Sequence, residues 1–545
     1  MQAGGRPSEV ERWKEHPVAP RACAAAAALL FLLLSAVSCT KVGPDYVRPP
    51  APVASAWQEA DGQRVTQGPA DYRAWWRVFN DPVLDRLIDT AYRQNLQLRI
   101  AGVRVLEARA QLGIVVGQLY PQTQQVSGAL QYNGLSSHST ISAIESGLFT
   151  YWQDQIGIGG SWEIDFWGKF RRGVESADAS LLASVADYDN ALVSLTADVA
   201  TNYINVRTLE KRIEIARKNV ESQLENLKIV EARAEFGTAT EREVAQARTL
   251  LNETRATVPA LQIQLQQTKH ALSILLGMPP SDLARELSGP SAIPIPPMQV
   301  TVGIPADLIR RRPDVRGAEY RAMAQCAQIG VARAYLYPAF AISGDFGFLS
   351  TNIPGSSLAD ISQWNSRNYV VGPGLTWNVL NYGQLTNNVR LQDARFQELL
   401  ITYQNALLTA QQNVEDAIVA YLRAQERAEL LAGSTAAARR SLDLGSQQYR
   451  LGTTDFTTVI VSSQALYTEQ DNFVTTLGAV ANNLVAIYRA LGGGWEIREG
   501  KDLVPAEIRQ AMAKRTGWGR LLDFAAYMPP ETPEKERPLV RPPDW

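Results

Sequence analysis

Two halves of this chain repeat each other at a spacing of about 215 residues, and this repeat constrains the fold more than any other feature. Solenoid repeats have periods of roughly 20–50 residues, so the spacing is too long for a solenoid. We expect a protomer with two matched segments, residues 71–290 and 291–500, that contributes both to a pseudo-symmetric ring. The correspondences are Trp162 with Trp377, Gly168 with Gly383, residues 236–238 with 451–453, and residues 276–277 with 491–492.

The composition excludes several classes of protein. Among 545 residues, 53 basic and 55 acidic side chains give a net charge of −2, which does not indicate a nucleic-acid partner. No apolar run of roughly 18 residues follows residue 40, so we expect no helical membrane span in the mature chain. Cys326 is predicted to be a small buried hydrophobe. Because His138 and His270 lie far apart in sequence, we predict no His-based metal or catalytic cluster. The sequence suggests no nucleotide motif, Ser/His/Asp set or paired-carboxylate cleft, so we predict no metal site and no enzymatic activity.

The N-terminus has the pattern of a secretory signal followed by a lipid anchor. Basic residues precede an apolar stretch over residues 22–37, and small residues then lead to Cys39. This pattern resembles a bacterial lipobox, which predicts a signal peptide over residues 1–38 and a covalent lipid on Cys39 as the only added group. Thr40 favours delivery to the outer membrane, and residues 39–70 are expected to form an extended, proline-rich tether. The alternative is an ordinary signal peptide with a chance cysteine.

Each half contains a very long predicted helix that reverses at a glycine. From residue 174 to 234, apolar or small residues recur about every 3.5 positions, which is typical of a coiled-coil seam. At roughly 1.5 Å per residue, residues 171–235 span about 100 Å. The second copy covers about 384–450, and the returning helices cover about 241–276 and 456–491. Thr240 with Glu243, and Asp455, are predicted caps of the returning helices, which places the hairpin tips at Gly237 and Gly452.

Four short segments near the starts of the long helices alternate between apolar and polar residues. They cover about 126–132, 156–166, 340–348 and 369–379, and we expect them to pair as two hairpins. This alternation is the signature of a transmembrane barrel, although a soluble sandwich fits it equally well. Four strands cannot close a useful barrel, since about eight only just leave room for side chains. Three copies would supply twelve strands and remove every exposed edge.

Together these elements predict an α+β membrane protein. We expect a trimeric 12-stranded β-barrel, with four strands from each protomer, continuous with a long α-helical barrel built from the two repeats. Glu163, Asp165 and Asp345 are predicted to make the barrel lumen acidic and mildly cation-favouring. Neighbouring strand residues could equally satisfy these carboxylates.

Several motifs resemble those of one known family. They are residues 304–316 (IPADLIRRRPDVR), 161–169 (SWEIDFWGK), 337–340 (YPAF), 490–495 (ALGGGW) and 42–46 (VGPDY). The chain is similar over about residues 39–500 to the outer membrane efflux proteins, the TolC/OprM-like outer membrane factors, and to their lipoprotein branch. The resemblance implies a homotrimer in the bacterial outer membrane that extends into the periplasm. It also implies a periplasmic adaptor (membrane fusion protein) and an inner-membrane pump of the RND class as partners.

The resemblance suggests roles for the hairpin tips. Gly237, Thr238, Gly452 and Thr453 are expected to dock the adaptor. Family members often carry an acidic residue near the second tip that narrows the tube, but here Val461 stands at that position. The nearby Asp455 is interpreted as a helix cap. We therefore expect either an apolar gate formed by Val459 and Val461 or a gate formed by another residue.

The function we expect is passive conduction of small molecules or drugs from the adaptor and pump to the exterior. The first alternative is a type I secretion exit duct for polypeptides. The second is a non-conducting, lipid-anchored scaffold of the envelope. Residues 501–545 are expected to form a partly disordered C-terminal tail of unassigned role.

Overall fold

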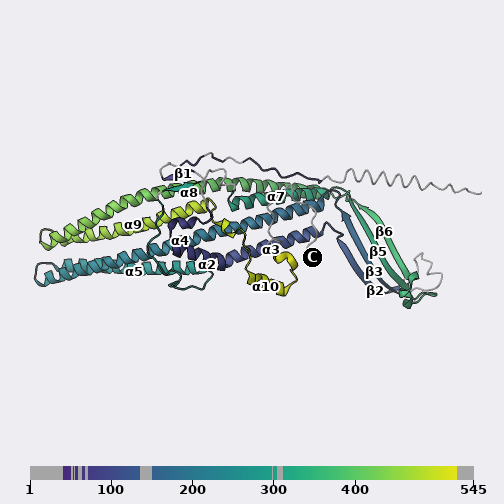
Figure 1. Cartoon of the computed structure of the whole chain (residues 1–545), viewed down its shortest axis with the longest axis horizontal. Helices are drawn as coiled ribbons and strands as arrows, with labels where there is room; N and C mark the ends of the chain where they lie inside the picture. Colours follow the sequence, from purple (N-terminus) through teal and green to yellow (C-terminus); the bar gives the residue numbers. More distant parts are fainter. Residues whose placement is uncertain are drawn as a thin grey trace, which may run out of the picture. The chain divides into compact units, whose positions relative to one another are not determined.

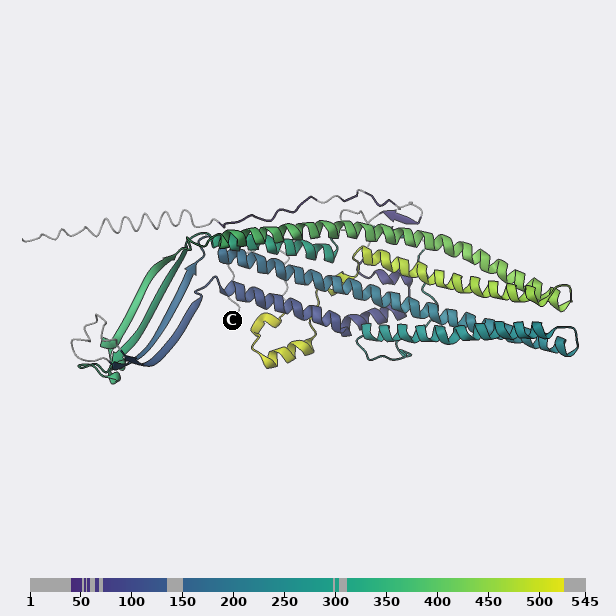
Figure 2. The same ribbon diagram turned by 180° about the vertical axis from the view of Figure 1, so that it is seen from behind.

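The computed structural model describes residues 41–50, 53–54, 56–58, 64–67, 72–134, 150–297, 299–302 and 311–523 (Figures 1 and 2). The predicted signal peptide and Cys39 lie outside these residues. The chain divides into two compact units. The sheet unit comprises Met1–Pro44, Gln118–Arg172 and Ile329–Val389, and the helical unit comprises Asp45–Gly117, Gly173–Gln328 and Arg390–Trp545. Each unit therefore takes segments from both halves of the sequence.

The helices recur at equal length in the two halves. The long helices α4 (Lys169–Glu235) and α8 (Gln384–Arg450) have 67 residues each, and their bounds differ by 215 positions at both ends. The returning helices α5 (Glu241–Leu275) and α9 (Phe456–Ala490) have 35 residues each. These four helices confirm the predicted bounds to within two residues.

Shorter helices complete the series. Helices α3 (Leu96–Gly117) and α7 (Pro313–Ala334) have 22 residues each, and α2 (Pro82–Gln94) precedes α3. Within the described part of the chain, no helix combines the length and the apolar character needed to cross a membrane.

The predicted seam of α4 is buried along most of its length. Members of the seam such as Leu192, Val199 and Tyr203 are fully buried, as is Val230 near the end of the helix. Because the apolar period is close to 3.5 residues, one stripe stays in contact with neighbouring helices over many turns. Cys326 on α7 is also buried, as predicted.

Both hairpin tips have the same backbone conformation, with a left-handed glycine that ends the long helix. Gly237 and Gly452 have φ values of 70° and 75°, a left-handed conformation that a side chain disfavours. The amide of Thr238 donates to the Arg233 carbonyl at 2.8 Å, and the amide of Thr453 donates to the Gln448 carbonyl at 3.0 Å. These bonds close each long helix at its glycine.

The predicted caps then start the returning helices. Thr240 and Glu243 form a capping box at the start of α5, and Asp455 accepts a bond of 3.2 Å from the Thr458 amide at the start of α9. The interpretation of Asp455 as a cap is therefore confirmed.

The sheet unit contains one four-stranded antiparallel sheet in the order β2-β3-β5-β6 (Figure 1). The strands are β2 (Thr123–Gly134), β3 (Thr150–Ile164), β5 (Ala339–Thr351) and β6 (Arg367–Thr376). The two predicted hairpins are present, and β3 pairs with β5 to join them. The sequence analysis placed the ends of two strands too far along the chain, at residues 166 and 379. The strand β3 ends earlier because Asp165 accepts bonds from the Phe170 and Arg171 amides at the start of α4.

Smaller elements lie in the predicted tether and in the predicted tail. The predicted tether over residues 39–70 contributes a strand, β1 (Val65–Gln67), that pairs in parallel with β4 (Val300–Val302). The predicted tail contains a helix, α10 (Ala506–Arg515), and a 3₁₀ turn, η6 (Gly519–Leu522). Residues 524–545 lie outside the described part of the chain. The remaining 3₁₀ turns are η1 (Trp75–Phe79), η3 (Leu358–Ser362), η4 (Trp364–Ser366) and η5 (Trp495–Arg498).

A buried charge cluster ties the segment after α9 to α4 and α7. Asp189 is fully buried and accepts hydrogen bonds from Arg498, one of them at 2.9 Å, while Arg316 lies 3.8 Å away. The Trp495 ring lies within 5.5 Å of both guanidinium groups. Burial raises the pKa of Asp189, and the hydrogen bonds from Arg498 oppose that shift. The cluster braces elements that lie far apart in sequence.

We predict that Asp189→Ala lowers the free energy of unfolding by about 3–5 kcal/mol, because Arg498 would stay buried with no carboxylate beside it. Urea unfolding of the purified protein, followed by circular dichroism, measures the effect. Asp187→Ala is the matched control, since its ion pair with Arg321 is about half exposed and should contribute only about 0–1 kcal/mol. Equal losses in the two variants would contradict a bracing role for Asp189.

Candidate functional sites: the two-faced sheet and the hairpin tips

One face of the sheet is apolar and exposed. The strand register places Val126, Ile158, Phe346 and Tyr369 in one row across the four strands. Their exposed fractions are 76, 58, 40 and 67%. A contiguous exposed apolar patch marks a surface that contacts another protein or a membrane. Further exposed members of this face are Leu130, Tyr132, Trp152, Ile156, Trp162, Ile164, Ile342, Val371 and Leu375.

The opposite face is polar and rich in glycine. Two rows of this face lie on either side of the Val126 row in the register. One consists of Gln125, Gly159, Asp345 and Val370, and the other consists of Ser127, Gly157, Gly347 and Asn368. Gly157 and Gly347 lie opposite each other at close range. A Cβ atom on Gly347 would come within 2.6 Å of the Ile156 carbonyl oxygen, so the two central strands approach because these side chains are missing.

The three carboxylates predicted to face a lumen have different surroundings. Glu163 forms an ion pair of 2.5 Å with Lys169, and Asp165 pairs with Arg171 at 3.1 Å. Asp165 also lies beyond the end of β3, so it is a helix cap and not a strand residue. The Asp345 carboxylate forms no hydrogen bond or ion pair with the residues that the structure describes. Glu163 and Asp165 are therefore paired with cationic side chains of α4, and not with the neighbouring strand residues that the sequence offered as an alternative.

The outer strands of the sheet each have one unpaired edge. Among the described strands, β2 pairs only with β3, and β6 pairs only with β5. Such an edge presents backbone N–H and C=O groups that can pair with another chain. Both outer strands are long, with 12 and 10 residues. The sheet is therefore open at both sides, and each outer strand can pair with a strand of another chain.

The hairpin tips expose a large apolar residue immediately before each glycine. Phe236 is 83% exposed and Leu451 is 79% exposed. The Thr238 and Thr453 hydroxyls, in contrast, bond back to the ends of the long helices, each at 3.0 Å. The docking prediction named the tip glycines and threonines and omitted Phe236 and Leu451, whose side chains the tips expose. The signal was present, because an apolar residue precedes the tip glycine in both halves.

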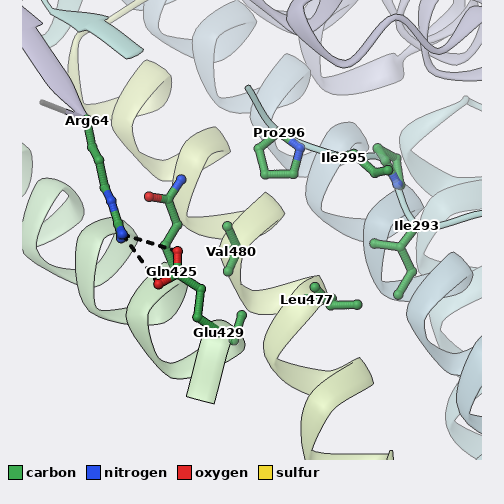
Figure 3. Close-up of a pocket in the computed structure, with 10 residues that line it drawn as sticks. Arg64, Ile293, Ile295, Pro296, Gln425, Glu429, Leu477 and Val480 are labelled. Atoms are coloured by element: carbon green, nitrogen blue, oxygen red, sulfur yellow. Dashed lines mark hydrogen bonds and ion pairs between the residues drawn. The ribbon is translucent and has the colours of Figure 1, made fainter. Parts of the chain in front are cut away.

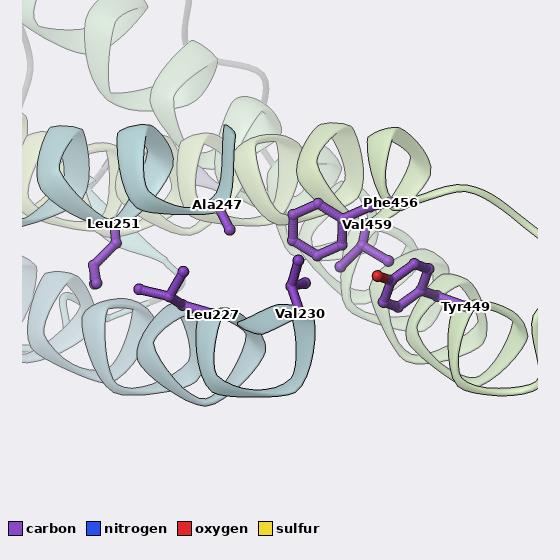
Figure 4. Packing of buried hydrophobic residues seen from close by; sticks show 7 residues of the cluster. All are labelled: Leu227, Val230, Ala247, Leu251, Tyr449, Phe456 and Val459. Carbon is purple, nitrogen blue, oxygen red and sulfur yellow. The ribbon is translucent and has the colours of Figure 1, made fainter. Parts of the chain in front are cut away.

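An apolar cluster joins the two hairpins just behind their tips (Figure 4). It consists of Leu227 and Val230 of α4, Ala247 and Leu251 of α5, Tyr449 of α8, and Phe456 and Val459 of α9. The Arg233 guanidinium reinforces it, since Arg233 donates to the Tyr449 carbonyl at 2.6 Å and lies 4.4 Å from the centre of the Tyr449 ring.

This cluster corrects the predicted gate. Val459 is only 2% exposed because it packs between the two hairpins of one chain, so it cannot line a passage. Val461 is 59% exposed and stays a candidate, while Asp455 serves as the cap of α9. The sequence pattern could not distinguish the two valines, because the contact between the hairpins joins residues more than 200 positions apart.

The helical unit also carries exposed apolar residues along its long helices. On α8 they include Ile401 at 55% and Leu430 at 69% exposure, and on α5 they include Ile263 and Ile274 at about the same level. Exposed apolar side chains spaced along a helix are typical of a face that packs against a further helix. The other exposed members are Leu391, Leu408, Val419 and Leu444 on α8, and Leu96, Ile100 and Ile114 on α3.

A pocket of about 220 Å³ lies between a proline-rich segment, residues 293–296, and helices α8 and α9 (Figure 3). Leu477 and Val480 form its apolar wall, and Arg64 and Glu429 form an ion pair of 3.1 Å at its side. It contains no set of groups suited to catalysis. Across the described residues, no group of three or more His, Cys, Asp or Glu side chains could hold a metal ion.

Comparison with characterised proteins identifies the family. The sequence model of the outer membrane efflux proteins matches residues 87–278 and again residues 304–493. The chain is 31% identical to the pyoverdine export outer membrane protein OpmQ of Pseudomonas putida KT2440, over 86% of this chain and 97% of the relative. It is 30% identical to the solvent efflux pump outer membrane protein SrpC of Pseudomonas putida, over 86% of this chain and 98% of the relative.

Solved structures agree with this assignment. The outer-membrane channel OprN superposes with a TM-score of 0.76 at 30% identity, covering 84% of this chain and 99% of that one. The Campylobacter jejuni CmeC outer membrane channel has a TM-score of 0.77 at 22% identity, which supports the fold alone. The two family matches, the relatives of nearly equal length and the shared fold show that this chain belongs to the outer membrane efflux protein family.

Proposed function

We propose that this protein is the outer-membrane channel of a tripartite efflux system, a passive conduit for small molecules. The observation that carries the proposal is the two-faced sheet, in which β2 and β6 each have one edge that pairs with no other described strand. An apolar face suits lipid, and lipid requires every backbone polar group to be paired. Pairing β2 of one copy with β6 of the next satisfies that requirement and leaves the polar face inside.

The number of copies follows from the size of the closed barrel. Four strands are too few to enclose space, whereas three copies give twelve strands and a lumen wide enough for solutes. The exposed apolar stripes on α8 and on α3 with α5 supply a second set of contacts between copies. We therefore infer a trimer in which a barrel and a helical tube form one conduit extending into the periplasm.

The partners follow from the absence of an energy source in the proposed mechanism. A conduit moves solute only down a gradient, so a pump must supply the work. The names of relatives such as the solvent efflux pump protein SrpC connect the family with pumps. We propose a periplasmic adaptor that docks at the hairpin tips and an inner-membrane pump of the RND class behind it.

The lipid anchor on Cys39 is a further part of this proposal. An acyl chain would hold the N-terminus at the membrane beside the barrel. Mass spectrometry of the mature N-terminal peptide tests it, and an unmodified Cys39 or cleavage at another residue would refute acylation.

We predict that the purified protein runs as a trimer in detergent and conducts ions across a planar bilayer without nucleotide. A monomer, or a trimer that never conducts, would overturn the proposed channel and favour a structural scaffold. Deletion of the gene should sensitise cells to small toxic compounds. Loss of a secreted polypeptide with unchanged drug sensitivity would instead support a secretion duct.

A charge on the apolar face of the sheet should prevent insertion. Val126→Arg is expected to cost about 2–4 kcal/mol in lipid, because position 126 lies on the face that we assign to the membrane. Gln125→Arg is the matched control, since it adds the same charge to the same strand on the opposite face. Membrane fractionation and trimer yield measure both. Equal tolerance of the two variants would contradict the assigned faces.

The tips should bind the adaptor through their exposed apolar residues. Phe236→Ser and Leu451→Ser are each expected to weaken adaptor binding by about tenfold or more, since burying such a side chain contributes roughly 1.5–3 kcal/mol. Ile295→Ser is the control, because Ile295 is 81% exposed but lies outside the tips. Affinity is measured by surface plasmon resonance with the purified adaptor. Unchanged binding by the double tip variant would exclude these residues as anchors.

Val461 is the remaining candidate for the apolar gate. We predict that Val461→Ala raises basal entry of a small fluorescent dye into cells, because a smaller side chain widens an apolar constriction. Val459→Ala should instead lower stability by roughly 0.5–3 kcal/mol without an increase in leak, since Val459 is buried between hairpins. Unchanged dye entry in Val461→Ala cells would exclude a gating role for Val461.

A further inference from the structure

The polar face of the sheet contains a hollow of about 380 Å³. Its floor is the pair Gly157 and Gly347, which lie opposite each other on β3 and β5 and carry no side chains. Ser127 and Asn368 flank this floor in the same row, on β2 and β6. All four strands therefore contribute one residue each to the row that forms the hollow.

Asp345 stands in the row next to this floor. A Cβ atom added to its partner Gly159 would overlap Asp345 Oδ1, so the carboxylate occupies the space above a glycine. The Gln155 side chain lies on the same face, on the other side of the floor. One carboxylate, two amides and a hydroxyl group thus surround a floor of backbone.

No described cationic side chain pairs with Asp345 on this face. Glu163, the other acid of the polar face in the described strands, is paired with Lys169. Arg367 and Asp154 belong to the apolar face, because their register positions alternate with those of the polar rows. A lone carboxylate with no nearby cation attracts positive charge from solution, and its field extends to about 10 Å at 0.1 M salt.

We propose that this hollow is a binding site for organic cations, in which Asp345 pairs with an ammonium or guanidinium group of the solute. A metal ion is a poor occupant, since Asp345 is the only charged side chain among the described residues that line the hollow, and divalent ions usually take several oxygen ligands. The volume suits a solute of several heavy atoms, and Ser127, Gln155 and Asn368 can accept hydrogen bonds from its N–H groups. This inference rests on the proposed function, which places three such hollows around one lumen.

Spermine is the probe for this site. Isothermal titration with the detergent-solubilised, full-length protein should detect spermine binding that Asp345→Asn weakens by roughly fivefold, the factor of one contact charge pair in water. In bilayers, the same variant should show weaker spermine block and a lower ratio of cation to anion permeability. Asn368→Asp, which adds a carboxylate to the floor row, should strengthen both binding and block.

Asp154→Asn is the matched control, because it removes the same charge from the same sheet on the opposite face. Spermine binding that is equal in Asp345→Asn and wild type, or equally weakened in Asp154→Asn, would overturn the site. Since titration requires no open pore, its result separates the two proposals. A protein that binds spermine through Asp345 but does not conduct contradicts the channel, and one that conducts without such binding contradicts only the site.

Discussion

Backbone hydrogen bonding at the edges of one sheet is the constraint on which the proposed assembly depends. The exposed row Val126, Ile158, Phe346 and Tyr369 favours lipid, and lipid does not tolerate the unpaired edges of β2 and β6. Closure with further copies satisfies the edges, encloses the polar face and determines where solutes can pass. In this proposal, closure of the sheet and residence in the membrane both depend on the pairing of backbone groups, whereas the number of copies depends on the size of the barrel.

The helical unit has a different requirement, which is to keep helices of 67 residues packed against their neighbours along their length. A seam with a period near 3.5 residues keeps α4 in contact with its neighbours, and the capped glycine turns end each hairpin cleanly. The cluster around Val230 and Tyr449 joins the hairpins near their tips, and the Asp189–Arg498 pair braces the other end of α9. Directional contacts therefore occur at both ends of the returning helix, with apolar packing between them.

Much of this architecture could be predicted from the sequence because its signals are periodic and local. Helix bounds, capping residues and hairpins depend on neighbours within a few positions, and these predictions were confirmed. The contacts that were missed join distant residues. Val459 is buried by residues of the first hairpin, and β1 pairs with a strand 235 positions away. Glu163 and Lys169 are close in sequence, but their pairing depends on where β3 ends and the turn into α4 begins, and the predicted end of β3 was two residues too late.

The equal lengths of the matched helices have an evolutionary consequence. Since α4 and α8 have 67 residues each and α5 and α9 have 35, any insertion in one hairpin would displace its tip by about 1.5 Å per residue relative to the other. A relative with a longer helical unit would need insertions in all four helices. Insertions of whole heptads would best preserve the apolar seam. Duct length should therefore change among descendants in discrete, paired steps.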